Sequence, residues 1–332
     1  MSDVTFLIPG LIADSAWATQ APRTPSVERI VSRGDATNSG ASDIDQWLLQ
    51  QFSVPDAGTL PIAPYSMLGD RLEPGGDYWL CADPVNLSIQ RDTCVLTPAQ
   101  LLELKDEETR ALVAALNQHF HDDGLLFRPG SNERWYVKSD RPVAMTTCSL
   151  RQVSGRSVTA FQPSGQDAKQ WLRIANEAQM LLHSHPVNAA REARGARTAN
   201  GLWLWGGGVV HTLASQFDCV VSDDAWARGL AIASNRRWQS VAEPIDYRHA
   251  KLLVVDRSLE SARLSGDASA WRAGMENIES QLIAPTIAAL RAGKLTHIGL
   301  LTDAGTGLYQ WRLARLHLWR IWRGRRALAE RQ

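Results

Sequence analysis

Short apolar runs alternate with amphipathic helical stretches near both ends of this chain, and the alternation restricts its fold more than any other sequence feature. Such alternation is typical of a mostly parallel sheet with helices covering both faces. The sequence therefore predicts an α/β core. The expected strands are residues 4–8, 219–221, 251–255 and 297–302, and the expected helices are residues 25–33, 43–52, 209–217, 224–233 and 268–291.

The middle of the chain interrupts this pattern. A turn-rich Pro74-Gly75-Gly76 opens it, and a long helical stretch closes it. The expected strands here are residues 78–82, 134–138 and 143–146, and the expected helices are residues 106–120 and 167–183. We therefore expect an inserted α+β domain at residues 71–185 and a core domain formed by residues 1–70 and 186–332, with ligands bound in the cleft between them.

Composition excludes several classes of protein. The 35 Lys and Arg residues balance the 35 Asp and Glu residues, so net charge gives no reason to expect nucleic acid or an anionic membrane as the main partner. The four cysteines are widely spaced, which predicts buried reduced thiols and no disulfide framework or zinc site. No apolar stretch suits a signal peptide or a membrane span, so we expect a cytoplasmic protein.

Residues 176–208 contain the most distinctive pattern. Helical spacing continues to His185, and Pro186 is expected to end the helix because its ring clashes with the preceding turn. A polar connector follows, and residues 202–205 then have the alternation of a buried strand. The strand is expected to break at the glycines from Gly206 to Gly208, which permit a positive φ or a close approach to another group.

This stretch resembles the segment that joins the inserted domain to the core in archaeal-type cofactor-independent phosphoglycerate mutases, of the alkaline phosphatase superfamily. The whole chain is also similar to a bacterial group described as phosphoglycerate-mutase-like regulatory proteins. The resemblance implies an alkaline-phosphatase-like core with an inserted α+β domain. The matching residues are His185, Pro186, Val187, Asn188, Arg191, Gly195, Ala199, Asn200, Trp203, Leu204, Trp205, Gly206 and Gly208. Those proposed as cleft or ligand-binding residues are His185, Asn188, Arg191, Asn200, Trp205, Gly206 and Gly208.

The resemblance also implies six positions for a nucleophile and the ligands of two Mn or Mg ions. Ser42 matches the phosphoryl-accepting nucleophile, at a helix N-terminus where amide groups stabilise phosphate. Asp303 matches a ligand, and Glu260 is a conservative change. The other three positions are Pro9, Leu264 and Ala304, whose side chains have no donor atom. Because phosphoryl transfer by two metal ions needs several ligands for each ion, we expect no cofactor and treat Ser42 as a plain N-cap.

The end of the chain, residues 309–326, interleaves arginines with tryptophans. Such a segment could stack on nucleic-acid bases or lie on a membrane surface. The alternation around Trp311 and Leu313 instead favours an edge strand, with Leu316, Trp319 and Trp322 packed under the core and the arginines in water.

Three functions follow from these observations. The preferred one is a non-catalytic, regulatory relative of the mutases that binds an unknown ligand, which could be phosphorylated, or a protein partner. The second is an active metal-dependent phosphoglycerate mutase or phosphatase that uses Ser42. The third is a nucleic-acid- or membrane-associated factor that uses the C-terminal arginines and tryptophans.

Overall fold

The computed structural model describes residues 2–12, 17, 21–37, 39–55, 60–90, 93–304, 307–320 and 322–323. The chain forms two compact units, which we call the core unit, residues 1–54 with 212–332, and the inserted unit, residues 55–211. The inserted unit is wider than the expected residues 71–185. Its extra length includes helix α4 (Ile62–Gly69) and strand β7 (Gly201–Gly208), which both pack on strand β3 (Tyr78–Gln90).

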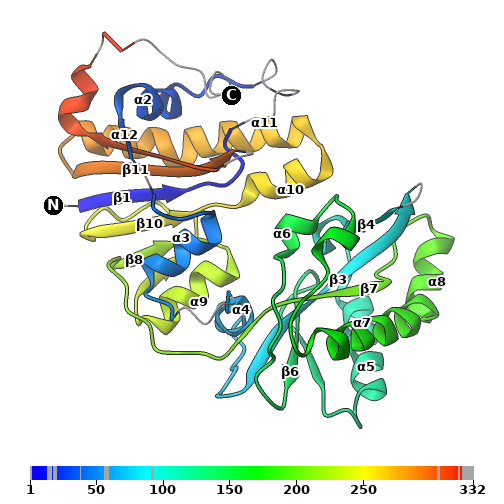
Figure 1. The fold of residues 1–332 in the computed structure, drawn as a ribbon. Helices are drawn as coiled ribbons and strands as arrows, with labels where there is room; N and C mark the ends of the chain where they lie inside the picture. The colour runs from blue at the N-terminus through cyan, green and yellow to red at the C-terminus, as the bar shows by residue number, and fades with distance from the viewer. Residues whose placement is uncertain are drawn as a thin grey trace. The chain divides into compact units, whose positions relative to one another are not determined.

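The core unit is built on a mixed sheet with strand order β2-β12-β11-β1-β10-β8-β9. Strands β11, β1, β10, β8 and β9 run parallel to one another (Figure 1). Strand β12 runs antiparallel to β11, and β2 runs antiparallel to β12, in the same direction as the parallel strands. The strands are β1 (Ser2–Leu7), β2 (Asp35–Thr37), β8 (Cys219–Val221), β9 (Arg237–Gln239), β10 (Lys251–Val255), β11 (Leu295–Ala304) and β12 (Gly307–Ala314).

Helices cover the sheet of the core unit. Phe6, Val254 and Leu300 join α2, α11 and α12 in one apolar cluster, while Leu7, Leu253 and Leu301, with opposite side-chain direction, are also buried. Burial on both faces explains why these strands are continuous apolar runs. The helices are α2 (Pro25–Arg33), α3 (Ile44–Gln51), α9 (Ala225–Ala233), α10 (Ser258–Ser265), α11 (Ala268–Asn277), the π-helical η3 (Ile278–Ile283), α12 (Ala284–Arg291) and the 3-10 turn η4 (Arg315–Trp319).

The N-terminus of α2 is capped from a distant part of the chain. The side chain of Thr24, the N-cap residue, makes no capping hydrogen bond. The buried carboxylate of Glu279 on η3 accepts hydrogen bonds from the N–H groups of Ser26 and Val27 at 2.8 and 3.1 Å. A carboxylate at this position satisfies amides that have no partner within the helix and interacts favourably with its dipole.

Two expectations for the core unit are wrong. Residues 209–217 form no helix; the N–H of Leu213 bonds to the carbonyl of Ala233, and Leu213 is buried as the chain enters the core unit. At the C-terminus, β12 is not an edge strand, because β2 pairs with its outer side. Leu316, Trp319 and Trp322 are not packed under the core, since they are 79%, 76% and 76% exposed.

The predictions for the cysteines and for membrane-spanning segments can be compared with the structure directly. Cys81 and Cys219 are buried free thiols, while the free thiols Cys94 and Cys148 are half-buried. Of the helices in the described part of the chain, none is both long and apolar enough to span a bilayer.

The inserted unit is an antiparallel sheet with helices. Strand order is β4-β3-β6-β5, and the long β3 also pairs with β7. The expected strand at residues 143–146 is reduced to a single bridge between Thr146 and Ser164. The remaining strands are β4 (Thr93–Thr97), β5 (Leu126–Pro129) and β6 (Trp135–Ser139), and the remaining helices are η1 (Ala99–Leu101), α5 (Asp106–His119), α6 (Leu150–Val153), η2 (Val158–Phe161), α7 (Ala168–His183) and α8 (Pro186–Ala193).

The expected polar connector after Pro186 is the helix α8. Proline is well tolerated as the first residue of a helix, where its missing N–H would have no partner within the helix. Helix α7 has already ended at His183, and His185 is the N-cap of α8. Pro186 therefore begins a second helix and does not terminate the first.

Candidate functional site

The carboxyl edge of the core sheet is the place where a site is expected. Strands β1, β10 and β11 are parallel neighbours, so the residues that follow them gather at one edge. Open α/β sheets bind ligands at this edge. Gly10 follows β1, Arg257 follows β10, and Asp303 lies at the end of β11.

Asp303 is held by a backbone amide and lies beside an arginine. Its Oδ1 accepts a hydrogen bond from the N–H of Gly10 at 2.7 Å and lies 3.8 Å from Nη1 of Arg263 on α10. Gly10 has a φ of 76°, and a Cβ atom at this position would lie 2.8 Å from Cδ of Arg263. Glycine therefore serves two purposes here: it adopts the left-handed turn, and it lets the arginine side chain pass over the loop after β1.

Glu260 belongs to a second arginine-centred cluster. Nη1 of Arg257 donates to Glu260 at 3.3 Å, and Nη2 donates to Asp45 on α3 at 2.8 Å. The guanidinium lies 5.6 Å from the ring centre of Trp226, within cation–π distance. Burial lowers the pKa of Arg257, but nearby carboxylates, first Glu260 and then Asp45, raise it above its ordinary value. Arg257 is therefore a permanent cation between these carboxylates.

Ser42 lies outside helix α3 and is exposed. The N-cap is Asp43, one residue later than expected, and its carboxylate accepts a hydrogen bond from the N–H of Gln46 at 2.8 Å. The hydroxyl of Ser42 donates to Oε1 of Gln46 at 2.9 Å. The aspartate takes the capping role because its carboxylate reaches the amide of the third helical residue.

Pro9, Leu264 and Ala304 complete the six compared positions, and their side chains are hydrocarbon. Pro9 is buried after β1, and Leu264 is half-buried on α10. Ala304 is the last residue of β11, opposite Gly307 of β12. Within the described residues, no group of three or more His, Cys, Asp or Glu side chains is arranged to hold a metal ion.

The first four ligand-binding candidates, from His185 to Asn200, form their side-chain hydrogen bonds within the inserted unit. Nδ1 of His185 accepts the N–H of Val187 at 3.2 Å, and burial lowers the pKa of this histidine. The side chain of Asn188 bonds to the carbonyl of Leu182 and to both backbone groups of Ala199.

The side chains of Arg191 and Asn200 are also hydrogen-bonded within the inserted unit. The guanidinium of Arg191, only 1% exposed, donates to Glu108 and to the carbonyls of Leu102 and Arg197. The amide of Asn200 pairs with both backbone groups of Leu87, at 2.7 and 3.0 Å. These contacts fix the connection between α7 and β7, and a role of the four residues in ligand binding stays a prediction.

Trp205, Gly206 and Gly208 lie on β7, which continues through the glycines. Nε1 of Trp205 donates to the buried carboxyl of Asp83 at 2.7 Å. Gly206 has a φ of 64°, and a Cβ atom at Gly208 would lie 2.5 Å from Cβ of Pro61, next to α4. The glycines thus allow the chain before α4 to lie directly on the strand.

The sequence pattern did not indicate Arg257, Arg263 or Asp45 as parts of the site. A signal for Arg257 exists, since it comes two residues after the expected strand at 251–255, at the edge where ligands bind. Arg263 has no comparable signal, because its approach to Asp303 depends on the packing of α10 over Gly10.

Part of this chain is similar in sequence to known phosphoglycerate mutases. A family model for 2,3-bisphosphoglycerate-independent phosphoglycerate mutase matches residues 85–188. The probable enzyme of this kind from Geobacter sulfurreducens is 30% identical over 132 residues, which cover 40% of this chain and 33% of that protein. The enzyme from Methanosarcina mazei is 25% identical over 198 residues, which cover 57% of this chain and 49% of that enzyme. The chain thus spans less than half the length of each of these two relatives.

The fold of this chain is also similar to that of a solved structure. The PH0037 protein from Pyrococcus horikoshii aligns with a TM-score of 0.57 at 14% identity, over 94% of this chain and 87% of that chain. Together with the mostly parallel sheet, this likeness confirms the predicted α/β fold, and the middle of the chain forms the expected α+β unit. The resemblance predicted from the residues between His185 and Gly208 is also confirmed: this chain is similar in sequence to the 2,3-bisphosphoglycerate-independent phosphoglycerate mutases.

Proposed function

We propose that this chain is a non-catalytic, regulatory relative of the phosphoglycerate mutases, which acts by binding a ligand or a protein partner. One observation carries the proposal: the carboxylates at the expected metal positions face arginines. Asp303 lies beside Arg263, and Glu260 is hydrogen-bonded to Arg257.

Arginine and a divalent ion cannot share these carboxylates easily. A guanidinium has no lone pair for a metal, stays protonated, and already provides positive charge beside these half-buried carboxylates. A metal ion beside Asp303 would also be repelled by the nearby guanidinium of Arg263. With hydrocarbon side chains at Pro9, Leu264 and Ala304, the residues present fit a two-metal centre poorly.

Metal analysis combined with an activity assay tests this proposal. We expect protein purified with Mn²⁺ or Mg²⁺ to retain no stoichiometric metal and to leave 3-phosphoglycerate unconverted, because Ser42 has no metal ion to activate it. Ser42→Ala should therefore match the parent chain in every assay. Stoichiometric Mn²⁺ together with turnover that Ser42→Ala abolishes would establish the active-enzyme alternative instead.

A second candidate function is association with a lipid surface through the C-terminal segment. Leu316, Trp319 and Trp322 are exposed, although such large apolar side chains are usually buried. Leu316 and Trp319 are three residues apart within the 3-10 helix η4, a spacing of one turn that favours a common face for these two side chains. Tryptophan is well suited to the membrane–water interface, where its apolar ring leaves water.

The orientation of two arginines makes nucleic acid the weaker candidate. Arg320 is hydrogen-bonded to Asp35, and Arg323 to the carbonyl of Gly34, within the core unit. The hydrogen bond from Arg320 also lowers the pKa of Asp35. Both guanidinium groups are therefore engaged by the protein, whereas the apolar side chains are exposed to a partner. Arg325 and Arg326 lie outside the described residues.

We expect Trp319→Ala with Trp322→Ala to weaken binding to anionic vesicles by about tenfold or more, because both rings leave the interface. Co-sedimentation with phosphatidylserine-containing vesicles measures this loss, and Trp238→Ala, at a 38% exposed tryptophan of β9, is the matched control. Parent protein that fails to sediment with vesicles would eliminate this candidate. Binding to single-stranded RNA that the same double variant abolishes would replace lipid with nucleic acid.

A further inference from the structure

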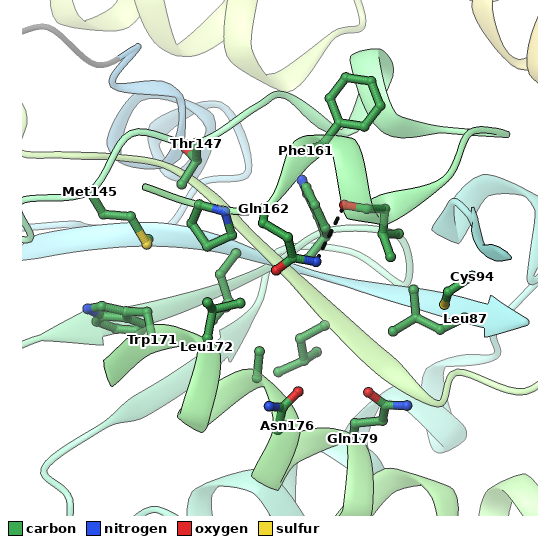
Figure 2. A pocket seen from close by; sticks show the side chains of 16 residues that line it. Leu87, Cys94, Met145, Thr147, Phe161, Gln162, Trp171, Leu172, Asn176 and Gln179 are labelled. Atoms are coloured by element: carbon green, nitrogen blue, oxygen red, sulfur yellow. Dashed lines mark hydrogen bonds between the residues drawn. The ribbon is translucent and has the colours of Figure 1, made fainter. Parts of the chain in front are cut away.

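A pocket of about 220 Å³ lies in the inserted unit, beside α7, β7 and the turn η2 (Figure 2). Trp171, Leu202 and Leu204 line it and belong to the larger apolar cluster of the unit. Trp203 and Phe161 also line it and belong to a separate, smaller cluster. The pocket is thus a gap where two apolar clusters meet, and most of its lining is hydrocarbon or aromatic.

Neutral polar groups complete the lining. Asn176 and Gln179 project from α7 on one side of the pocket, and Gln162 lies across from them (Figure 2). Gln162 donates a hydrogen bond to the carbonyl of Val158 at 3.4 Å, within the turn that covers this side. Thr147 adds a hydroxyl. Among the described residues that line the pocket, none has a charged side chain.

These features specify the kind of ligand. We propose that the pocket binds a small neutral molecule with an apolar ring and one hydrogen-bonding group. A cavity of about 150 Å³ lined by aliphatic and aromatic side chains can hold benzene, so this larger pocket accommodates a substituted ring. Apolar pockets with a few convergent polar groups are the usual form of small-molecule sites.

The uncharged lining of the pocket disfavours phosphorylated acids, the ligands that the mutase resemblance would suggest. A phosphorylated acid in this pocket would lose part of its hydration with no cation among the described lining residues to compensate. The pocket is therefore separate in chemistry from the carboxyl edge of the core sheet, where arginines and carboxylates meet. Ligand binding here does not depend on whether the core unit is catalytic.

Two probes with the same apolar body test the proposal: para-propylphenol, which is neutral at pH 7, and para-propylbenzoate, which is anionic. We expect calorimetric titration of the full chain to show saturable binding of the phenol and at least about tenfold weaker binding of the benzoate. Equal affinity for the two probes, or no binding of the phenol, would overturn the inference.

Variants on α7 locate the binding site. Ala175→Phe and Leu172→Trp each put a larger side chain at a lining position, and each should weaken phenol binding by about tenfold or more. Met180→Trp is the matched control, because Met180 is on the same helix, is 74% exposed and does not line the pocket. Circular dichroism confirms that the variants fold. Retention of parent-like affinity by folded Ala175→Phe and Leu172→Trp would place the probe elsewhere and reject the pocket.

Discussion

Arg191→Met is expected to lower the free energy of unfolding by about 3–5 kcal/mol, the usual cost of removing one partner from a buried ion pair. Arg191 is 1% exposed and donates to Glu108, whose side chain is only 8% exposed. The methionine would also leave the carbonyls of Leu102 and Arg197 without this donor. Urea unfolding followed by circular dichroism measures the loss.

Arg194→Met provides the matched control for this prediction. Arg194 contacts the other oxygen of Glu108, but its side chain is 45% exposed, so its removal should cost less than about 1 kcal/mol. Equal destabilisation by the two substitutions would show that burial does not decide the strength of this cluster. Glu108→Gln combined with Arg191→Met should be less harmful than Arg191→Met alone, since no buried charge remains.

Asp83→Asn is expected to remove a pH dependence of stability. Burial raises the pKa of Asp83 to about 7 from its ordinary 3.8, and the indole N–H of Trp205 only partly offsets this. The unfolded chain therefore releases the proton at lower pH than the folded chain, so the stability due to Asp83 is lost as pH rises towards 7. Relative to Asp83→Asn, the parent chain should lose about 2–3 kcal/mol between about pH 5 and about pH 8.

Thermal and urea unfolding of both proteins across this pH range measures the difference. Asp122→Asn is the control, because the Asp122 side chain is fully exposed and its substitution should leave the pH profile unchanged. A constant difference between Asp83→Asn and the parent chain at all pH values would mean that Asp83 is ionised in the folded state.

Much of the core could be predicted from local patterns. The strands at residues 219–221 and 251–255 match β8 and β10, because both are apolar runs buried on two faces. The long helix expected at residues 268–291 is formed by α11, η3 and α12 in succession. The helix expected at residues 209–217 does not form. Apolar residues recur there at helical spacing, but the segment makes long-range contacts instead, such as the hydrogen bond from the N–H of Leu213 to the carbonyl of Ala233.

The candidate site was less predictable. Comparison with a family identified Ser42, Glu260 and Asp303, but spacing along the sequence could not show which cations lie beside these side chains. Arg263 reaches Asp303 from 40 residues earlier in the chain, over a glycine turn, and Glu279 caps a helix more than 250 residues away. The exposure of Trp319 and Trp322 was missed because the hydropathy of a side chain does not specify which face of a short turn it occupies.

The position of Arg263 also determines the order of substitutions by which a metal-binding centre could be engineered into this protein. New ligands at positions 9 and 304 would bring a divalent ion towards Asp303, where Arg263 already lies 3.8 Å away. Removing Arg263 first would eliminate the charge that repels a divalent ion. Adding carboxylate ligands first would instead surround the guanidinium of Arg263 with negative charge and hold it more firmly beside Asp303. The route to such a centre therefore begins with the loss of an arginine.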